Sequence, residues 1–323
     1  MSVLYVASVA RSLPSPNPTM RFPPLLRSGA RVALIAPAGP VRGPRDIERA
    51  MASVQRMGWE PVLGEYLAER DGYLAGSDER RVADFNRYAA DDSIDALWCV
   101  RGGYGAMRLL DDIDYDAWRR RPKPLIGYSD VTALHTAIGR LADVVTFHGP
   151  TARGAMTDFS VESLARAVSS GGNSCGVAEL ARTLVPGRAS GRLVGGNLAL
   201  LAALSGTPFA PLYENGILVV EDVGEAVYRI DRMLTQLRLS GALDGIAGIA
   251  FGQFTEIPDD STNAQCPLDR VLQETADRLG VPCVAGIPMG HCDTQWTIPL
   301  GAVAELDADA RTLTVHATGG EER

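Results

Sequence analysis

The chain has 323 residues, of which 31 are Lys or Arg and 39 are Asp or Glu, so its formal charge is −8. Hydrophobic residues make up 46% and charged residues 22%, as in folded globular proteins, which excludes a mainly disordered or collagen-like chain. The acidic balance argues against nucleic acid as the main partner, and the length favours two domains over one. No apolar run reaches the roughly 18 residues of a transmembrane helix, so we expect no membrane partner.

Residues 1–26 are expected to form a flexible leader. Eight apolar residues (3–10) precede Arg11 and a stretch with three prolines and no periodicity. Because no basic segment comes before the apolar residues, they make only a weak secretory signal. Met20 is an alternative start of the chain.

Strands alternate with helices between residues 27 and 170, the predicted N-terminal domain. Short buried apolar runs indicate strands over 31–37, 94–100, 124–128 and 144–147. Apolar residues at helical spacing indicate helices over 45–57, 80–88, 105–110, 130–141 and 161–168. Such βαβ units predict an α/β fold with a mainly parallel sheet of the flavodoxin or glutamine-amidotransferase type, in which ligands bind at the carboxyl ends of the strands.

A smaller α/β domain with a mixed sheet is predicted over 191–323, after a linker at 171–190. The small polar stretch 169–174 and a Pro-Gly pair at 186–187 indicate the linker. Strands are predicted over 216–220, 246–251, 302–306 and 313–315, and helices up to about 204, over 228–239 and over 268–279.

Ser129 lies between a predicted strand and a predicted helix. A sharp turn there would expose its hydroxyl group beside the free N–H groups of the helix start, which can stabilise an oxyanion. The G-x-S-x-G pattern is absent. The alternative is a serine N-cap, which local sequence alone favours.

Among the four histidines, the loop residue His291 is favoured as functional because loops carry function and it follows a glycine. His148 ends a strand, whereas His135 lies inside a helix and His316 in the terminal strand. Glu221 follows a strand and could orient a histidine, with an exposed strand-end charge as the alternative. The histidines and the five cysteines show no metal-site spacing, so we predict neither a metal site nor a disulfide framework.

Three glycines at 102, 103 and 105 resemble a phosphate-binding loop only loosely. Neither G-x-G-x-x-G nor G-x-x-x-x-G-K is present, so the sequence supports nucleotide binding only weakly.

Eight short motifs follow one another along the chain. They are Ala36-Pro37-Ala38-Gly39, Gly76-Ser77-Asp78-Glu79-Arg80-Arg81, Arg101-Gly102-Gly103-Tyr104-Gly105, Ile126-Gly127-Tyr128-Ser129-Asp130, Phe147-His148-Gly149-Pro150, Gly195-Gly196-Asn197-Leu198, Glu221-Asp222-Val223-Gly224-Glu225 and Gly286-Ile287-Pro288-Met289-Gly290-His291. In this order they resemble the LD-carboxypeptidase family of serine peptidases, the muramoyltetrapeptide carboxypeptidases, over nearly the whole chain.

The resemblance implies a catalytic triad. Matched motif by motif, Ser129 is the nucleophile, His291 the general base and Glu221 its orienting carboxylate. Glu225 is the competing acid because it belongs to the same motif. Glu221 is preferred because it directly follows a strand.

Substrate-binding groups are expected at the same edge of the sheet. The backbone N–H groups of Asp130 and of Gly102 or Gly103 are candidates for the oxyanion hole. A carboxypeptidase binds a free carboxylate, and Arg101 is the candidate because a guanidinium can hold it with two hydrogen bonds. Tyr128, beside the nucleophile, is a further candidate for substrate binding. Arg229 and Arg232 are less favoured, because a helical arginine is usually solvated.

The resemblance implies hydrolysis of a muropeptide tetrapeptide through an acyl-enzyme, releasing terminal D-Ala from the L-centre of a diamino acid. It also implies a cytoplasmic homodimer that serves peptidoglycan recycling, and triad chemistry requires no cofactor.

Three alternatives stay open. One is a microcin-immunity-type peptidase that cleaves an aminoacyl or peptidyl nucleotide, with Trp296 stacking on the base. Another is a non-catalytic α/β module that binds small anions. The last is a cysteine nucleophile at Cys292.

Overall fold

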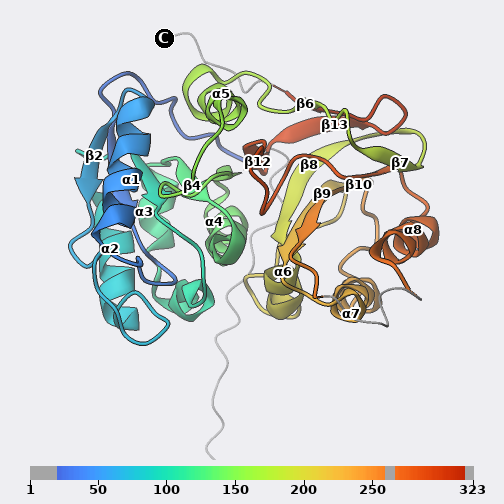
Figure 1. Ribbon diagram of the computed structural model, residues 1–323, viewed down its shortest axis with the longest axis horizontal. Helices are drawn as coiled ribbons and strands as arrows, with labels where there is room; N and C mark the ends of the chain where they lie inside the picture. The colour runs from blue at the N-terminus through green and yellow to red at the C-terminus, as the bar shows by residue number, and fades with distance from the viewer. Residues whose placement is uncertain (1–19, 259–265, 317–323) are drawn as a thin grey trace, which may run out of the picture.

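Two β-sheets, each with its own helices, make up the protein in a computed structural model that describes residues 20–258 and 266–316. The first half of the chain builds the blue and green part of Figure 1, and the second half builds the yellow to red part. The α/β fold class predicted from the sequence is confirmed.

The first sheet is mainly parallel. Its 6 strands run in the order β12-β5-β4-β3-β1-β2, and all adjacent pairs but β12–β5 are parallel. Their bounds are β1 Arg31–Ile35, β2 Glu60–Leu63, β3 Ala96–Cys99, β4 Leu125–Gly127, β5 Thr146–His148 and β12 Ile298–Leu300. Every residue of β3, β4 and β5 is buried, as expected for a parallel sheet with both faces covered.

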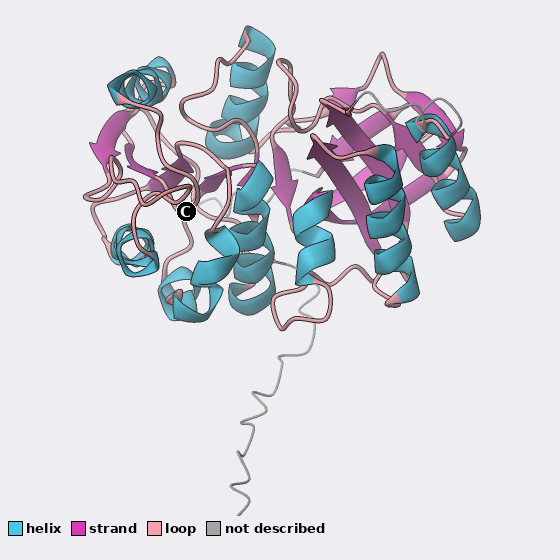
Figure 2. Ribbon diagram, turned by 60° about the horizontal axis from the view of Figure 1, so that its bottom comes forward, coloured by secondary structure: helices cyan, strands magenta, loops and turns pink. Residues whose placement is uncertain are grey.

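Helices cover both faces of this sheet (Figures 1 and 2). Ala50, Val54 and Leu164 pack on one face, whereas Phe85, Trp118 and Leu134 pack on the other. The helices are α1 Pro44–Arg56, α2 Asp78–Ala90, α3 Tyr115–Arg120, α4 Thr132–Ala142 and α5 Asp158–Ala165, which a π-helical turn (166–170) extends. Two 3₁₀ segments, η1 Ala106–Asp112 and η2 Ser129–Val131, complete this half.

The second sheet is mixed, as predicted. Its 8 strands run in the order β6-β14-β13-β8-β9-β10-β11-β7, with a parallel centre from β8 to β11 and antiparallel pairs outside it. Their bounds are β6 Gly176–Val177, β7 Arg182–Val185, β8 Arg188–Asn197, β9 Gly216–Val223, β10 Gly248–Thr255, β11 Cys283–Ala285, β13 Val303–Asp307 and β14 Thr312–Val315. One face packs on α6 Leu198–Leu204, α7 Val227–Leu239 and α8 Leu268–Leu279.

β12 joins the two halves. It belongs to the second half of the chain, yet it pairs antiparallel with β5 in the first sheet, with Ile298 opposite His148. Figure 1 shows it at the junction of the two parts. The predicted division therefore does not hold for this strand, because the edge of β5 needs a hydrogen-bonding partner and residues 298–300 supply it.

Two predicted segments differ in the structure. Residues 171–190, expected as a linker, contain β6, β7 and the start of β8, and β7 pairs with β11 at the edge of the second sheet. The described part of the expected leader, residues 20–26, is held against the first half. Arg21 N–H donates to Asp143 O at 2.8 Å, Leu26 N–H donates to Val168 O at 2.8 Å, and Leu26 is only 5% exposed. Residues 1–19 lie outside the described part of the chain.

Short elements account for the other differences. β2 has 4 residues and α3 has 6, too few for a clear apolar period, and the predicted helix at 105–110 is a 3₁₀ segment. Across residues 20–258 and 266–316, we find no helix that combines the length and the apolar character needed to cross a membrane.

Candidate active site

The carboxyl ends of three neighbouring strands bring the predicted nucleophile loop together. β1, β3 and β4 are parallel and adjacent, so the segments that follow them meet at one edge of the sheet. Gly39 N–H, after β1, donates to Gly102 O, after β3, at 3.0 Å. Gly102 in turn lies against Ser129, after β4, where a side-chain carbon at Gly102 would be 2.9 Å from Ser129 Cβ.

Ser129 has a strained backbone. Its φ is +66°, in the left-handed region that costs a non-glycine residue roughly 1–3 kcal/mol when the surroundings impose it. It is the first residue of the turn η2, whose N-cap is Tyr128, and the N-cap of α4 is Val131, so the N-cap alternative is not what the structure shows. A side-chain carbon at Gly102 would lie 3.1 Å from Ser129 Oγ, so only glycine leaves room beside that oxygen.

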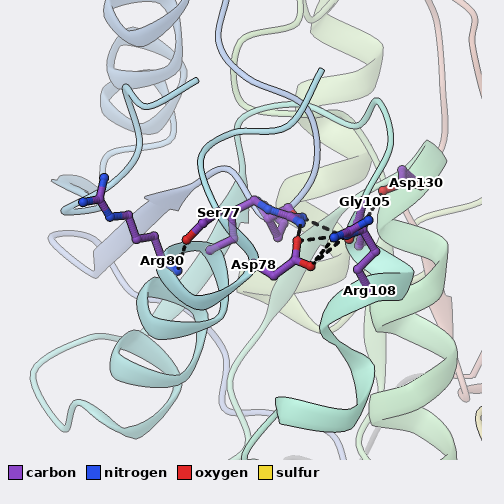
Figure 3. Close-up of polar contacts among 9 residues, drawn as sticks. Ser77, Asp78, Arg80, Gly105, Arg108 and Asp130 are labelled. Carbon is purple, nitrogen blue, oxygen red and sulfur yellow. Dashed lines mark hydrogen bonds and ion pairs between the residues drawn. The ribbon is translucent and has the colours of Figure 1, made fainter. Parts of the chain in front are cut away.

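A network of polar side chains supports the glycine loop, residues 102–105 (Figure 3). Arg81 is 2% exposed and donates to Pro37 O at 2.5 Å and to Gly105 O at 3.0 Å. Its other nitrogen pairs with Asp78. The carboxylate of Asp130 accepts the Ala106 N–H at 2.8 Å, and burial raises the pKa of Asp130 to about 6. The side chain of Asp130 thus supports the loop, while its backbone N–H begins a helical turn.

Two N–H groups in the glycine loop point to an oxyanion site. Within the described residues, neither the Gly102 N–H nor the Gly103 N–H donates to another backbone group. The Asp130 N–H belongs to the first turn of a helical segment, where N–H groups have no intrahelical acceptor. Of the three predicted donors, Gly102 lies against Ser129 and Asp130 follows it in the chain, whereas Gly103 lies against Gly39.

Glu221 and His291 form a hydrogen-bonded pair. His291 Nδ1 donates to Glu221 Oε2 at 2.7 Å, and Glu221, on β9, is 0% exposed. Gly290 has a φ of +103°, and a side-chain carbon there would be 2.5 Å from Glu221 Oε2. Glu225 instead lies 3.6 Å from Arg229 on the surface of α7. The structure therefore places Glu221, and not Glu225, against the histidine.

Asn197 links the two halves of the site, a role that the sequence analysis missed. Its backbone N–H, at the end of β8, donates to Thr132 Oγ1 at 2.9 Å, on the first residue of α4. Its side-chain amide donates to Asp222 Oδ1 at 2.9 Å and to Glu221 Oε1 at 3.5 Å. A side-chain carbon at Gly196 would lie 2.6 Å from Thr132 Oγ1. The signal was the motif at 195–198, whose glycine allows this close approach.

Tyr128 connects the nucleophile to the acid–base pair. Its ring centroid lies 4.7 Å from that of His291, and burial raises the pKa of Tyr128 to about 12. Among the described residues, Ser129 and His291 share no hydrogen bond. Tyr128, next to Ser129 in the chain, contacts the His291 ring and so links the nucleophile to the acid–base pair. Catalytic hydrogen bonds are often long before substrate binds.

The other histidines have no such arrangement. His135 Nε2 contacts Gly127 O at 2.9 Å and burial lowers the pKa of His135 to about 4, while His316 is on the surface 3.5 Å from Glu305. His148 is fully buried, and burial lowers its pKa well below the usual range.

The residues of the alternatives are not placed for their proposed roles. Burial raises the pKa of Cys292 to about 11, which keeps it a thiol at neutral pH. Trp296 is 2% exposed and packs in the core, so it offers no face to a nucleotide base. Within residues 20–258 and 266–316, no group of three or more His, Cys, Asp or Glu side chains could hold a metal ion.

Arg101 lies at the edge of the glycine loop. Its Nη1 donates to Pro40 O at 2.7 Å, and burial together with nearby arginines lowers its pKa. One of these is Arg153, which follows β5 and which the sequence analysis missed. Its place after a parallel strand was the available signal. Arg229 and Arg232 lie instead over the exposed ring of Tyr228.

Comparison with known protein families assigns the chain to one family. Residues 32–149 match the model of the LD-carboxypeptidase N-terminal domain, and residues 190–306 match that of the C-terminal domain. The chain belongs to the LD-carboxypeptidase family. This membership confirms the resemblance predicted from the eight motifs and the prediction of a serine-type carboxypeptidase.

Relatives in this family match along most of their length. A protein of Streptomyces coelicolor is 44% identical over 91% of this chain and 95% of its own. The murein tetrapeptide carboxypeptidase of Pseudomonas aeruginosa is 35% identical over 86% of this chain and 94% of its own.

Solved structures share the fold. A muramoyltetrapeptide carboxypeptidase from Oxalobacter formigenes has a TM-score of 0.79 at 30% identity, covering 88% of this chain and 98% of its own. The microcin C7 self-immunity protein MccF has a TM-score of 0.83 at 24% identity, covering 92% of this chain and 98% of its own. The second likeness concerns the fold alone.

Proposed function

We propose that this enzyme hydrolyses the amide bond between the L-centre of a diamino acid and a terminal D-Ala in muropeptide tetrapeptides. The observation that carries the proposal is the buried Glu221–His291 pair, at 2.7 Å, packed against Tyr128 next to the strained Ser129. The relatives named for murein tetrapeptides support this choice of substrate.

The hydrogen bond to Glu221 sets the tautomer of His291. With the proton on Nδ1 donated to the carboxylate, Nε2 keeps its lone pair and can act as a base. In the proposed mechanism Nε2 takes the proton of Ser129 as Oγ attacks the scissile carbonyl carbon. Glu221 then stabilises the imidazolium ion that forms.

The carbonyl oxygen becomes an anion in the tetrahedral intermediate. The N–H groups of Asp130 and of Gly102 or Gly103 are the proposed donors to it. When the intermediate collapses, the C–N bond breaks and the imidazolium gives its proton to the leaving amine of D-Ala. Water then attacks the acyl-Ser129 ester with His291 again as base, which releases the shortened peptide and restores the serine.

The leaving D-Ala carries the free carboxylate that defines a carboxypeptidase substrate. Arg101 is the proposed partner of this carboxylate, because a half-buried guanidinium beside the glycine loop can pair with it in two hydrogen bonds.

Release of D-Ala tests the function directly. The wild-type enzyme is incubated with L-Ala-γ-D-Glu-meso-diaminopimelyl-D-Ala and with the same peptide ending in L-Ala, and the freed amino acid is quantified. We expect turnover of the first peptide alone. Turnover of neither peptide, together with hydrolysis of an aminoacyl sulfamoyl adenosine, would instead support the microcin-immunity-type alternative.

We further propose that the enzyme is a cytoplasmic homodimer serving peptidoglycan recycling, as the family resemblance implies. Light scattering of the purified protein measures its mass in solution, and a monomer mass near 34.4 kDa at micromolar concentration would contradict the dimer. Fractionation of the source cells tests the compartment.

A further inference from the structure

Arginines gather around the loop between β1 and α1, next to the nucleophile loop. Arg101 Nη1 donates to Pro40 O at 2.7 Å, and Arg70 Nη2 donates to Val41 O at 2.9 Å. A side-chain carbon at Gly39 would lie 3.4 Å from Arg101 Cζ and 3.0 Å from Gly102 O. The loop thus touches the arginines on one side and the glycine beside Ser129 on the other.

Two further arginines complete the group around a single carboxylate. The backbone N–H of Arg42 donates to Asp46 Oδ2 at 2.9 Å, and Arg153 Nη1 lies 3.8 Å from the same oxygen. Because this ion pair is long and the oxygen already accepts from a backbone N–H, Arg153 keeps hydrogen-bonding capacity.

Positive charge exceeds negative charge in this group. The pKa of Arg101 is lowered by burial and then by Arg153, Arg42 and Arg70, with only Asp46 acting against them among the largest influences. Four guanidinium groups and one carboxylate leave a surplus of three positive charges, in a chain whose formal charge is −8. The Nε atoms of Arg101 and Arg153 are also buried without a hydrogen-bond partner within the described residues. Such a surplus beside a binding site attracts anions.

One terminal carboxylate accounts for only part of this charge, because it pairs with a single guanidinium in the bidentate geometry. The backbone N–H of Arg153 donates to Val100 O at 3.3 Å, so Arg153 lies beside the residue that precedes Arg101. Its charge also lowers the pKa of Tyr128, against the larger effect of burial. A substrate with a second carboxylate would satisfy the remaining groups.

We propose that Arg153, with Arg42 and Arg70, forms a second anion subsite that binds a carboxylate on the acyl side of the scissile bond. This inference rests on the proposed function, in which Arg101 holds the carboxylate of the leaving D-Ala. The enzyme then selects peptides that carry an additional carboxylate near the cleaved bond.

Three matched tetrapeptides identify the carboxylate. The first is L-Ala-γ-D-Glu-meso-diaminopimelyl-D-Ala. The second has L-Lys in place of diaminopimelate and so lacks one side-chain carboxylate. The third keeps diaminopimelate but has D-isoglutamine, in which the carboxylate of D-Glu is an amide. For each peptide, kcat and KM of D-Ala release are measured at fixed ionic strength.

We expect one of the two altered peptides to lose roughly 10- to 100-fold in kcat/KM, mainly through KM, as for loss of a hydrogen bond to a charged group. The altered peptide that loses affinity shows which carboxylate binds. Equal kcat/KM values for all three peptides would overturn the subsite while D-Ala release upheld the proposed function. Release from none of them would overturn both.

Arg153→Gln tests the assignment to residues. In this variant the ratio of kcat/KM between the preferred and the altered peptide should fall to about one, and an unfolding temperature near that of the wild type shows that the variant is folded. Arg153→Lys should restore part of the preference, because it keeps the charge without the bidentate geometry. The matched control is Arg188→Gln, on the surface at the opposite end of β8 from Asn197, which should keep the full preference. A preference unchanged in Arg153→Gln would overturn the assignment.

Discussion

The nucleophile end and the acid–base end of the site are built by different means. At the first sheet, Ser129 has a strained backbone and packs against Gly102. A side-chain carbon at Gly102 would lie only 3.1 Å from Ser129 Oγ. At the second sheet, Glu221 is fully buried and is held by hydrogen bonds from His291 and Asn197. One end therefore depends on backbone shape, and the other on a satisfied buried charge.

This difference predicts which substitutions each end tolerates. A buried carboxylate needs its partners, since an unpaired buried charge costs several kcal/mol. The strained turn at Ser129 needs the space beside Gly102, so a larger side chain at position 102 should disturb it more than the loss of a hydrogen bond. Tyr128 and Asn197 contact both ends, so substitutions at the two ends can be compared within one connected site.

Removal of the nucleophile should have the largest effect. Ser129→Ala is expected to lower kcat roughly 10⁴- to 10⁶-fold, as for loss of a triad serine, because no other group in the site can form the acyl-enzyme. The thermal unfolding temperature should change little, since Ser129 makes no capping bond. Near-normal D-Ala release by this variant would contradict the triad, whereas release by neither the wild type nor the variant would favour a non-catalytic anion-binding module.

The buried acid should come next. Glu221→Gln should lower kcat up to roughly 10⁴-fold, because an amide no longer fixes the histidine tautomer or stabilises the imidazolium. Glu225→Gln is the matched control, since its carboxylate lies on the surface beside Arg229, and it should retain activity. Steady-state kinetics of both variants decide between the two acids, and equal losses would refute the assignment of Glu221.

Added volume beside the nucleophile should have an intermediate effect. In Gly102→Ala the new carbon would be 2.9 Å from Ser129 Cβ, so the loop must shift and displace its N–H groups from the oxyanion. We expect kcat to fall about 10²- to 10³-fold. Gly172→Ala, whose new carbon would meet only Ser170 Oγ at 3.5 Å, should leave kcat unchanged. Full activity of Gly102→Ala would show that the close approach is not needed.

The smallest effect concerns stability and its dependence on pH. Burial lowers the pKa of His135 from 6.5 to about 4, so the unfolded chain takes up a proton below pH 6.5 while the folded protein stays neutral. The stability present above pH 6.5 is therefore lost as the pH falls toward 4, by up to about 3 kcal/mol.

His135→Gln keeps a donor for Gly127 O but does not titrate. The difference in unfolding free energy between pH 7 and pH 4.5, measured with urea, should be smaller in this variant than in the wild type. The buried carboxyl groups are the same in both proteins. His135 also lowers the pKa of His148, whose ring centroid lies 6.3 Å from its own, so the comparison reports on the two rings together. Identical pH profiles would contradict the neutral buried state.

Local pattern was sufficient for much of the fold. Apolar runs such as 31–37 and 94–100 predicted buried strands, because a strand covered on both faces needs apolar side chains throughout. The helix at 45–57 followed from one apolar face. β2 and α3 escaped, since with 4 and 6 residues they are too short to show a clear apolar period. The edge strand in the supposed linker, residues 182–185, escaped because its partner β11 lies about 100 residues away.

The site residues divide in the same way. The order of the eight motifs predicted Ser129, Glu221 and His291 as the triad, because residue types and their sequence neighbours carry the family resemblance. The local signals of Arg153 and Asn197 were weak, a place after a parallel strand and a glycine motif, and their importance comes from neighbours that are distant in sequence.

By itself, the sequence determined the acidic composition, the alternation of strands and helices and the family, since these depend on residue types and short-range order. The tertiary structure decided that Glu221 rather than Glu225 meets His291, that β12 crosses to the first sheet, and that Arg70, Arg101 and Arg153 contact neighbouring loops. Contacts between residues far apart in sequence depend on strand order and register, and no local pattern encodes them.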